Sequence, residues 1–393
     1  MKEIQPVCHS DCLQAHHVLV ALAALGVTGR HWPCVEAYGG PKQLAQQGFE
    51  TLFGVLVQTG KASKSGKDRQ QLSQMLHTAL QQARQLDAFV TQGGWIMGVQ
   101  GSRELMRLNR CRAPLLCAFF EGNRQHIRHR PVVAIVGSRK ADARGLQRTR
   151  DLAYRLAQEG ILIVSGAAMG TDCAAHEAAV QAGGCTLAIL GDPLNPSKSL
   201  LPKRLSHLPA DLVSVLTPFG PWVAPASFLF AARNQYMASL ADAVVVMQGT
   251  AGSGTLHTAR YAQQLGVPLW AMPGDVEDPL AAAGNELLEQ GWARACISSE
   301  SLLGHVLKTP KKSVVNSLET VLQKREQKAA KLDLNEAQQK LLGMLHSCLG
   351  VATVDELCQK LQMQVQQLQS MLLELELKGL IVRKGAQVVL GEV

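Results

Sequence analysis

The sequence predicts an α/β protein built on a doubly wound parallel sheet, with a helical module before the sheet and a winged helix after it. The first observation is that short apolar runs alternate with helix-like segments through the middle of the chain. Strands that are buried on both faces of a parallel sheet have this continuous apolar character. The second observation is that three of these runs end in glycine-rich turns. Apolar runs joined by helices imply crossover connections and hence a doubly wound sheet.

Residues 1–90 are expected to form a small helical module of the SAM-like kind. Three helix-like segments lie in this region, HHVLVALAALG, PKQLAQQGFETLFGVL and DRQQLSQMLHTALQQARQL. Glycines interrupt the pattern between the first and second of these segments. The pattern therefore predicts short helices joined by turns.

Residues 91–303 are expected to form the α/β core. Two strands are predicted to open it, at residues 95–97 and 115–120. The runs expected to form the parallel sheet are residues 132–136, 161–164, 186–190, 212–216, 243–247 and 268–272. Helix-like segments lie near residues 145–159, 172–182, 228–241 and 256–265. Ligands of such sheets bind beyond the carboxyl ends of the strands, which makes the turns at those ends the candidate site.

Three glycine-rich turns are predicted at those carboxyl ends. The first is Gly137-Ser138-Arg139, the second spans residues 165–172, and the third spans residues 249–255. A turn that leads into a helix directs free backbone N–H groups at an anion. Asp172 is predicted to cap the helix after the second turn. The third turn has the glycine spacing of a Walker A loop, but Thr255 stands where that loop needs lysine, which argues against an ATPase.

Positive charge is concentrated in one segment of the chain. The formal net charge is +8, whereas residues 103–150 alone contain 12 Lys and Arg and three acids, a net of +9. This segment surrounds the first glycine turn, where Arg139 and Lys140 add two cations. A phosphate-bearing partner fits this distribution better than diffuse basicity does. We expect residues 103–130 to extend a track for phosphates beyond the turn.

Arg233 and Asn234 lie at the start of the helix-like segment after the fourth strand of the sheet. Phe228 and Phe230 come just before them. Arginine beside aromatic side chains suits base stacking combined with phosphate contact. Two phenylalanines in an apolar stretch are equally consistent with core packing, so both interpretations stay open.

The N-terminal residues and the cysteines give no firm metal site. Cys8, His9, Cys12, His16 and His17 lie close together in sequence and suggest a metal ion, but no CxxC and no second cluster completes four ligands. We therefore expect no metal and no cofactor. The N-terminus lacks the layout of a signal peptide and no apolar run reaches the length of a membrane span, so the expected location is the cytoplasm, without membrane contact.

The last part of the chain is expected to be a lysine-rich linker, residues 304–332, and a winged helix, residues 333–393. Helices are predicted at residues 335–348, 353–361 and 364–378, and strands at residues 380–384 and 387–390. Three helices followed by a hairpin make a winged helix. The third helix has one cation, Lys378, against two glutamates. A helix that reads DNA normally carries cations, so this domain is expected to contact protein.

Four motifs occur in an order that resembles the DNA-processing protein A (DprA/Smf) family. They are VAIVGSRKADARG, SGAAMGTDCAAHEAA, RNQYMASLADAVVVMQGTAGSGTLHTA and VPLWAMPGDVEDPLAAAGNELLEQG. The resemblance implies an extended Rossmann-like core that binds single-stranded DNA. It also implies a homodimer that protects incoming DNA during natural transformation and helps load the RecA recombinase, with no catalytic residues and no enzymatic activity in that role.

The resemblance assigns the DNA groove to the three turns and to the start of the helix at Arg233. The residues it implies are Arg139, Gly166, Gly170, Arg233, Asn234, Ser253 and Gly254. Gly137, Ser138, Lys140, Phe230 and Thr255, which come from the reading of the turns and of the aromatic beside Arg233, complete the predicted DNA-binding site.

The sequence departs from the family pattern beside Arg233. Ala231 and Ala232 replace a proline and a cation, and Gln235 replaces an arginine. A tyrosine-proline segment after the third strand of the sheet is also absent. Fewer cations predict weaker binding with a smaller salt dependence. Lys198, Lys203 and Arg204 are the candidates to compensate.

The main alternative is a nucleotide-binding sensor or a nucleotide-sugar hydrolase of the same Rossmann-like superfamily. Those hydrolases carry a catalytic glutamate soon after a glycine-threonine turn, whereas Leu256, His257 and Thr258 follow Thr255 here. A dehydrogenase fits less well, because the first turn lacks GxGxxG. A pure protein scaffold leaves the basic segment unexplained.

Overall fold

The computed structural model describes most of the chain as two compact units, residues 1–308 and 309–393. In the first unit it describes residues 14–308 except 48, 60, 62–65, 100–104, 112 and 128–129. In the second unit it describes residues 337–390 except 339–340, 342–350, 362, 378–380 and 385–386.

The first unit is built on one nine-stranded sheet. Its strand order is β1-β2-β6-β5-β4-β3-β7-β8-β9. The strands are β1 Gly94–Gly98, β2 Cys117–Glu121, β3 Val132–Val136, β4 Leu162–Ser165, β5 Thr186–Ile189, β6 Val213–Thr217, β7 Ala243–Val246, β8 Leu269–Ala271 and β9 Arg294–Ala295. The strands from β6 to β9 in this order are parallel, and β1 and β2 add an antiparallel edge beside β6. The predicted doubly wound sheet is confirmed, and the eight predicted strands match within two residues at each end.

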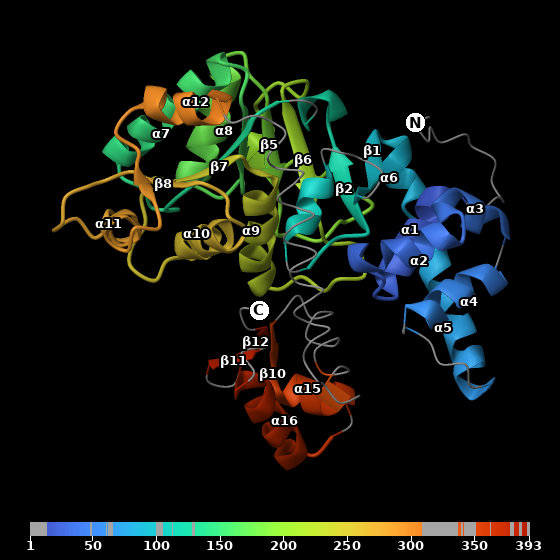
Figure 1. The fold of residues 1–393 in the computed structure, drawn as a ribbon. Coiled ribbons are helices and arrows are strands. Elements are labelled where there is room, and N and C mark those ends of the chain that lie inside the picture. The colour runs from blue at the N-terminus through green and yellow to red at the C-terminus, as the bar shows by residue number, and fades with distance from the viewer. Residues whose placement is uncertain are drawn as a thin grey trace. The chain divides into compact units, whose positions relative to one another are not determined.

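The chain reverses its direction of travel across the sheet at β3. It moves outward through β4, β5 and β6, then returns to place β7 on the other side of β3. Helices α7 (Ala143–Gln158) and α8 (Thr171–Gln181) cover one face, while α9 (Phe228–Leu240) and α10 (Gly254–Gln264) cover the other (Figure 1). The carboxyl ends of β3 and β7 therefore form a topological switch point, where such sheets bind ligands.

Local sequence explains the central unit of strand, turn and helix. All five residues of β3 are buried, as its apolar run predicts. Asp142 is the N-cap of α7, and its side chain accepts a hydrogen bond from the Gly145 amide at 2.6 Å. Gly160, with φ +74°, follows the C-cap of α7, where glycine allows the chain to leave the helix. The first turn thus lies between the buried strand β3 and the capped start of α7, and Gly160 marks the other end of that helix.

The N-terminal helices pack against the antiparallel edge of the sheet (Figure 1). They are α1 Ala15–Ala24, α2 Trp32–Ala37, α3 Gly40–Gln47, α4 Phe49–Gln58, α5 Gly66–Arg84 and α6 Asp87–Thr91. Their buried residues, such as Leu22 and Leu44, share one hydrophobic cluster with Phe119 and Val215 of the sheet. The helices expected in residues 1–90 are present. They do not form a separate hydrophobic core but share one with the strands of the sheet.

The end of the first unit differs from the expected linker. Helix α12 (Ser299–Lys308) runs five residues into the segment predicted as linker, and Leu303 and Val306 are buried in the core beneath it. The remaining predicted linker, residues 309–332, lies outside the described residues. Helix α11 (Ala282–Glu289) lies between β8 and β9 in the chain.

The second unit has the elements of the predicted winged helix. Helices α15 (Val354–Leu361) and α16 (Val365–Leu377) precede the hairpin of β11 (Ile381–Lys384) and β12 (Gln387–Leu390). A short strand that was not predicted, β10 (Val351–Thr353), pairs with β12. Most of the first predicted helix, residues 335–348, lies outside the described residues.

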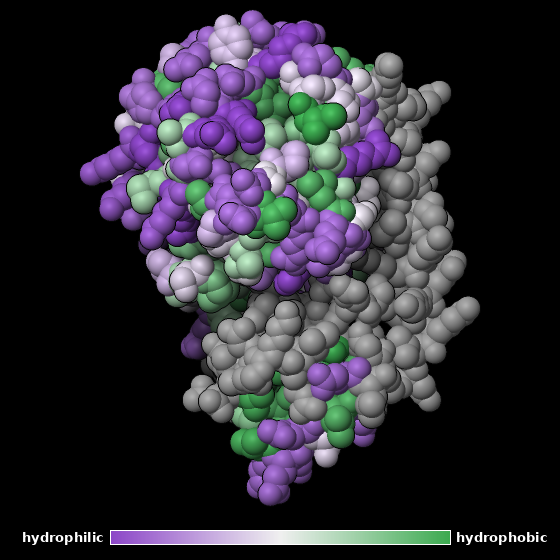
Figure 2. Space-filling view, turned by 90° about the vertical axis from the view of Figure 1, so that its left-hand side faces the viewer, coloured by the Kyte–Doolittle hydropathy of each residue, from purple (hydrophilic) through white to green (hydrophobic). Residues whose placement is uncertain are grey.

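Polar side chains dominate the face of the first unit that Figure 2 shows, with small scattered hydrophobic patches among them. No single helix among the described residues is long and apolar enough to cross a membrane. This face of the first unit therefore presents mainly charged and polar groups. The groups that lie at the carboxyl edge of the sheet are the ones that can contact a ligand there.

Candidate nucleic-acid interface

The three predicted glycine turns lie side by side. They follow β3, β4 and β7, and these strands are neighbours in the order β4-β3-β7. Because the strands are parallel, all three turns emerge at the same edge of the sheet. This proximity, which the sequence analysis expected from the alternation of strands and helices, is confirmed.

The first turn presents the two exposed cations. Arg139 and Lys140 are both exposed, while Gly137 and Ser138 are half-buried. The Lys140 amide donates to Oγ of Ser138 at 3.0 Å, and the Ser138 carbonyl accepts the amide of Thr171 at 3.2 Å. The turn is therefore held in place by its own serine and by the start of α8, and it leaves both cationic side chains at the surface.

Gly170 is required for the first and second turns to pack together. Its φ is +78°, and a Cβ built at this position would lie 2.5 Å from the Ser138 carbonyl oxygen and 2.7 Å from that of Arg139. Both contacts are with backbone, which cannot swing away. Only glycine fits this position without moving the turn that carries Arg139.

We expect Gly170→Ala to lower the free energy of unfolding by about 2 kcal/mol or more, because it adds both backbone strain and a steric clash. Denaturant unfolding followed by tryptophan fluorescence measures this change. Gly304→Ala is the matched control, since nothing lies within 4 Å of its Cβ in α12 and the helix gains from alanine. Equal midpoints for Gly170→Ala and the unsubstituted chain would contradict the close packing of the two turns.

Asp172 occupies the second turn, which corrects its predicted role. The N-cap of α8 is Gly170, whereas the buried Asp172 carboxylate accepts the amides of Gly166 at 3.1 Å and Ala168 at 3.2 Å. Burial raises the pKa of Asp172, and the positive charge of Arg233 and these hydrogen bonds oppose that shift. The Gly166 amide was expected to donate a hydrogen bond to a phosphate of the ligand. In the structure it donates to the Asp172 carboxylate instead.

Arg233 lies beneath the second turn. It is only 5% exposed, and its guanidinium donates to the Ile189 carbonyl and to Oδ1 of Asn234. Burial lowers the pKa of Arg233 to about 10, although Asp172 raises it. A Cβ on Gly166 would lie 2.3 Å from the guanidinium nitrogens, so the glycine makes room for this side chain. Direct phosphate contact by Arg233, predicted from the sequence, is not supported by this arrangement.

Asn234 links the second turn to the third. Its Nδ2 donates to the Gly254 carbonyl at 3.5 Å, at the start of α10. Ser253 is the N-cap of that helix, with a half-buried side chain whose Oγ has no hydrogen-bond partner among the described residues. Gly254 is exposed and Thr255 is buried. The Arg233–Asn234 pair therefore supports two turns at once.

Exposed apolar side chains lie on the same edge as the cations. Met169, at the tip of the second turn, is 65% exposed, and at the start of α9 Phe228 and Phe230 are 55% and 37% exposed. Phe230 packs over Gly191, just beyond the end of β5, where a Cβ would lie 2.8 Å from the Cα of Phe230. Of the two interpretations of Phe228 and Phe230, exposed rings and core packing, the structure supports exposed rings. Met169 was not predicted as a site residue, although its place as a large apolar residue between Gly166 and Gly170 was a signal in the sequence.

The expected phosphate track over residues 103–130 is wrong for its central arginines. Arg107 forms a two-contact ion pair with Asp242, and the same carboxylate accepts the Val132 amide at 2.8 Å. Arg110 donates to the carbonyls of Ser239 and Leu265, and burial lowers its pKa to about 10. These cations fasten the segment to the sheet and to α9, so they cannot serve a ligand on the surface.

Other cations do reach the surface near the three turns. Arg144 and Arg148 are exposed on the first turns of α7. Lys198, Lys203 and Arg204, the candidates to compensate for lost cations, are exposed in the segment between β5 and β6. Exposed cations are therefore available beyond the first turn, on α7 and in the segment between β5 and β6.

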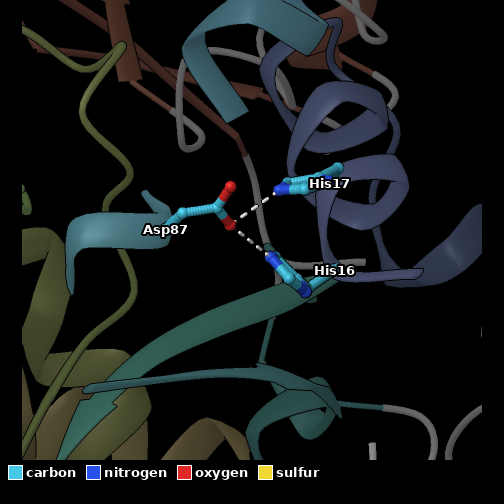
Figure 3. A group of neighbouring side chains, drawn as sticks. All are labelled: His16, His17 and Asp87. Atoms are coloured by element: carbon cyan, nitrogen blue, oxygen red, sulfur yellow. Dashed lines mark hydrogen bonds and ion pairs between the residues drawn. The ribbon is translucent and has the colours of Figure 1, made fainter. Parts of the chain in front are cut away.

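A separate cluster of His16, His17 and Asp87 joins α1 to α6 (Figure 3). Nε2 of His17 lies 2.8 Å and Nε2 of His16 lies 3.1 Å from Oδ1 of Asp87. Nδ1 of His17 accepts the backbone N–H of Gln14 at 3.1 Å, so the neutral ring carries its proton on Nε2 and donates it to Asp87. A metal at Nε2 would have to replace that proton. The cluster is thus organised for hydrogen bonding between two helices, while the other members of the predicted cluster, Cys8, His9 and Cys12, lie outside the described residues.

Comparison with known families matches two ranges of the chain. Residues 103–306, more than half of the chain, match DNA recombination-mediator protein A, and residues 325–387 match the DprA winged helix domain. This chain belongs to the DNA recombination-mediator protein A family. The first matched range contains all three turns, so the interface described above lies in the part that the DprA family shares.

Individual DprA relatives are moderately similar to this chain. A DNA processing protein DprA of Streptococcus pneumoniae is 36% identical over 191 residues, which are 49% of this chain and 66% of that protein. Protein Smf of Escherichia coli is 34% identical over 178 residues, 44% of this chain and 47% of that protein. The X-ray structure of DprA from Streptococcus pneumoniae has a TM-score of 0.56 at 26% identity and covers 74% of this chain and 97% of that one. The sequence alignments thus span about half to two thirds of these relatives.

Proposed function

We propose that this DprA-family chain binds single-stranded DNA without sequence preference at the carboxyl edge of its sheet. The observation that carries the proposal is the juxtaposition of two exposed cations, Arg139 and Lys140, with the exposed Met169 and Phe230 on neighbouring strand ends. Cations neutralise phosphates, and apolar or aromatic side chains stack on bases whatever their identity. A duplex hides its base faces, so this combination favours the single strand.

Within this proposal the predicted site residues divide into two groups by exposure. Residues in the first group reach the surface and are assigned to contact the strand; they are Gly137, Ser138, Arg139, Lys140, Gly170, Phe230, Ser253 and Gly254. Residues in the second group are buried and are assigned to hold the turns in position; they are Gly166, Arg233, Asn234 and Thr255.

The wider role we propose is that of a recombination mediator rather than an enzyme. Family membership and the motif resemblance support a chain that protects incoming strands in the cytoplasm during natural transformation and helps load RecA, acting as a homodimer. The third turn supports a non-catalytic role at that position, because Thr255 replaces the lysine of a phosphate-hydrolysing loop and no glutamate follows closely.

Fluorescence anisotropy tests the proposal with a labelled oligo-dT strand and a matching duplex across a series of salt concentrations. We expect tighter binding to the single strand and a logarithmic affinity that falls by about 0.7 per phosphate contact for each tenfold rise in salt. Equal affinity for the duplex, or affinity that does not change with salt, would overturn the proposal.

A further inference from the structure

A concave site lies beside the turns, at the switch point of the sheet. It has a volume of about 440 Å³, which is within the usual range of small-molecule sites. Its lining comes from the start of α7 after β3, from Met247 and Gln248 after β7, and from Met272 to Gly274 after β8. None of the residues assigned above to the DNA interface lines it.

One wall of this cavity carries two arginines. Arg144 and Arg148 lie one turn apart on α7, both exposed, and neither forms an ion pair within the part of the chain that the structure describes. Side chains four residues apart in a helix point the same way. Two guanidinium groups so placed suit a phosphate group, which they can contact with several charge-assisted hydrogen bonds.

The lining also includes two carboxylates from the chain after β8, Asp275 and Asp278. Asp275 Oδ1 accepts the Glu277 amide at 3.0 Å, and Asp278 Oδ1 accepts the Leu280 amide at 2.9 Å. Asn285 makes a two-way amide contact with Gly274 at 3.2 Å in each direction and fixes the base of this segment. Each aspartate therefore keeps a second oxygen that can accept hydrogen bonds from a ligand.

The remaining surface of the cavity is apolar and firmly positioned. Met247, Met272 and Pro273 contribute apolar surface. Gln248 donates to the Asp142 carboxylate at 3.2 Å and accepts the Asp142 amide at 3.2 Å, which joins the α7 wall to the β7 wall. A Cβ on Gly145 would lie 2.0 Å from the Gln248 side chain, so this contact depends on glycine.

We propose that this cavity binds a ribonucleoside phosphate. Arg144 and Arg148 hold the phosphate, Asp275 or Asp278 accepts the ribose hydroxyls, and the base lies against the methionines and proline. Carboxylates accept ribose hydroxyls at the corresponding edge of other nucleotide-binding sheets. A DNA strand fits the lining less well than a ribonucleotide does, because DNA offers no 2′-hydroxyl to Asp275 or Asp278.

Isothermal titration calorimetry of the full chain without DNA tests this inference, with ADP, dADP and inorganic phosphate as probes. We expect ADP to bind at least tenfold more tightly than dADP and than phosphate. The double variant R144A/R148A is expected to lose at least tenfold in ADP affinity, and D275N/D278N to lose most of the preference for ADP over dADP. Arg155→Ala is the matched control on α7, where Arg155 pairs with Glu159 away from the cavity.

Arg139→Ala separates this cavity from the proposed DNA interface. ADP affinity that is unchanged in Arg139→Ala and reduced in R144A/R148A supports the cavity, whatever the DNA measurements show. ADP affinity that falls in Arg139→Ala instead would place the nucleotide on the turns and overturn the inference. Absence of ADP binding, or equal affinity for ADP and dADP, would also overturn it.

Discussion

Replacing Arg233 with alanine is expected to lower the free energy of unfolding of the first unit by about 3 kcal/mol or more. Its guanidinium is buried against Gly166, donates to the Ile189 carbonyl, and lies in the field of the buried Asp172 carboxylate. Removing one member of a buried pair of charges leaves the other unpaired, which costs about 3–5 kcal/mol. The cavity left by the side chain adds to that loss.

Tryptophan fluorescence during denaturant unfolding measures this change in the relevant unit, since all five tryptophans lie within residues 1–308. Arg233→Lys keeps the charge and is expected to lose less stability than Arg233→Ala. Arg155→Ala, which removes a half-buried arginine of α7 and its i,i+4 ion pair with Glu159, is the control and should change stability by no more than about 0.5 kcal/mol. A loss for Arg233→Ala as small as that for Arg155→Ala would show that the buried position carries no structural role.

The sheet could be predicted closely from sequence because each of its central strands is an apolar run of four or five residues. Burial on both faces leaves little room for other residue types, and β3 was placed at its observed bounds. Glycine turns then marked the carboxyl ends correctly. The strand β9 was missed, since its two residues are exposed and carry no periodic pattern.

The direction in which charged side chains point could not be predicted in the same way. Arg107 pairs with Asp242, which is 135 residues away, and no local pattern announces a partner at that distance. The basic segment around Arg139 therefore looked continuous with Arg107, an arginine that is half-buried and paired within the protein. The number of charged residues follows from the composition, but which of their side chains are exposed to solvent depends on the fold.

Asp172 shows the same limit on a shorter scale. Its position after a glycine turn fits an N-cap, yet the N-cap of α8 is Gly170, two residues earlier, and the Asp172 carboxylate accepts the amides of Gly166 and Ala168. A sequence pattern can predict that a turn exists, but it does not predict which group accepts the hydrogen bond of each backbone amide in that turn. The two arginines of the predicted site thus have different surroundings, which sequence alone could not separate: Arg233 is internal and Arg139 is exposed.

Replacing the exposed Arg139 with alanine is expected to weaken single-stranded DNA binding by about tenfold, equally for every sequence, because one charged hydrogen bond to a phosphate is lost. The salt dependence should fall by about 0.7 in logarithmic slope, the value for one contact with a single strand. Anisotropy with oligo-dT and a mixed-sequence strand measures both, and Arg155→Ala should match the unsubstituted chain. Unfolding midpoints should stay unchanged, since the Arg139 side chain is exposed. A loss confined to one DNA sequence would mean that Arg139 reads bases, and no loss at all would place the DNA elsewhere than on the first turn.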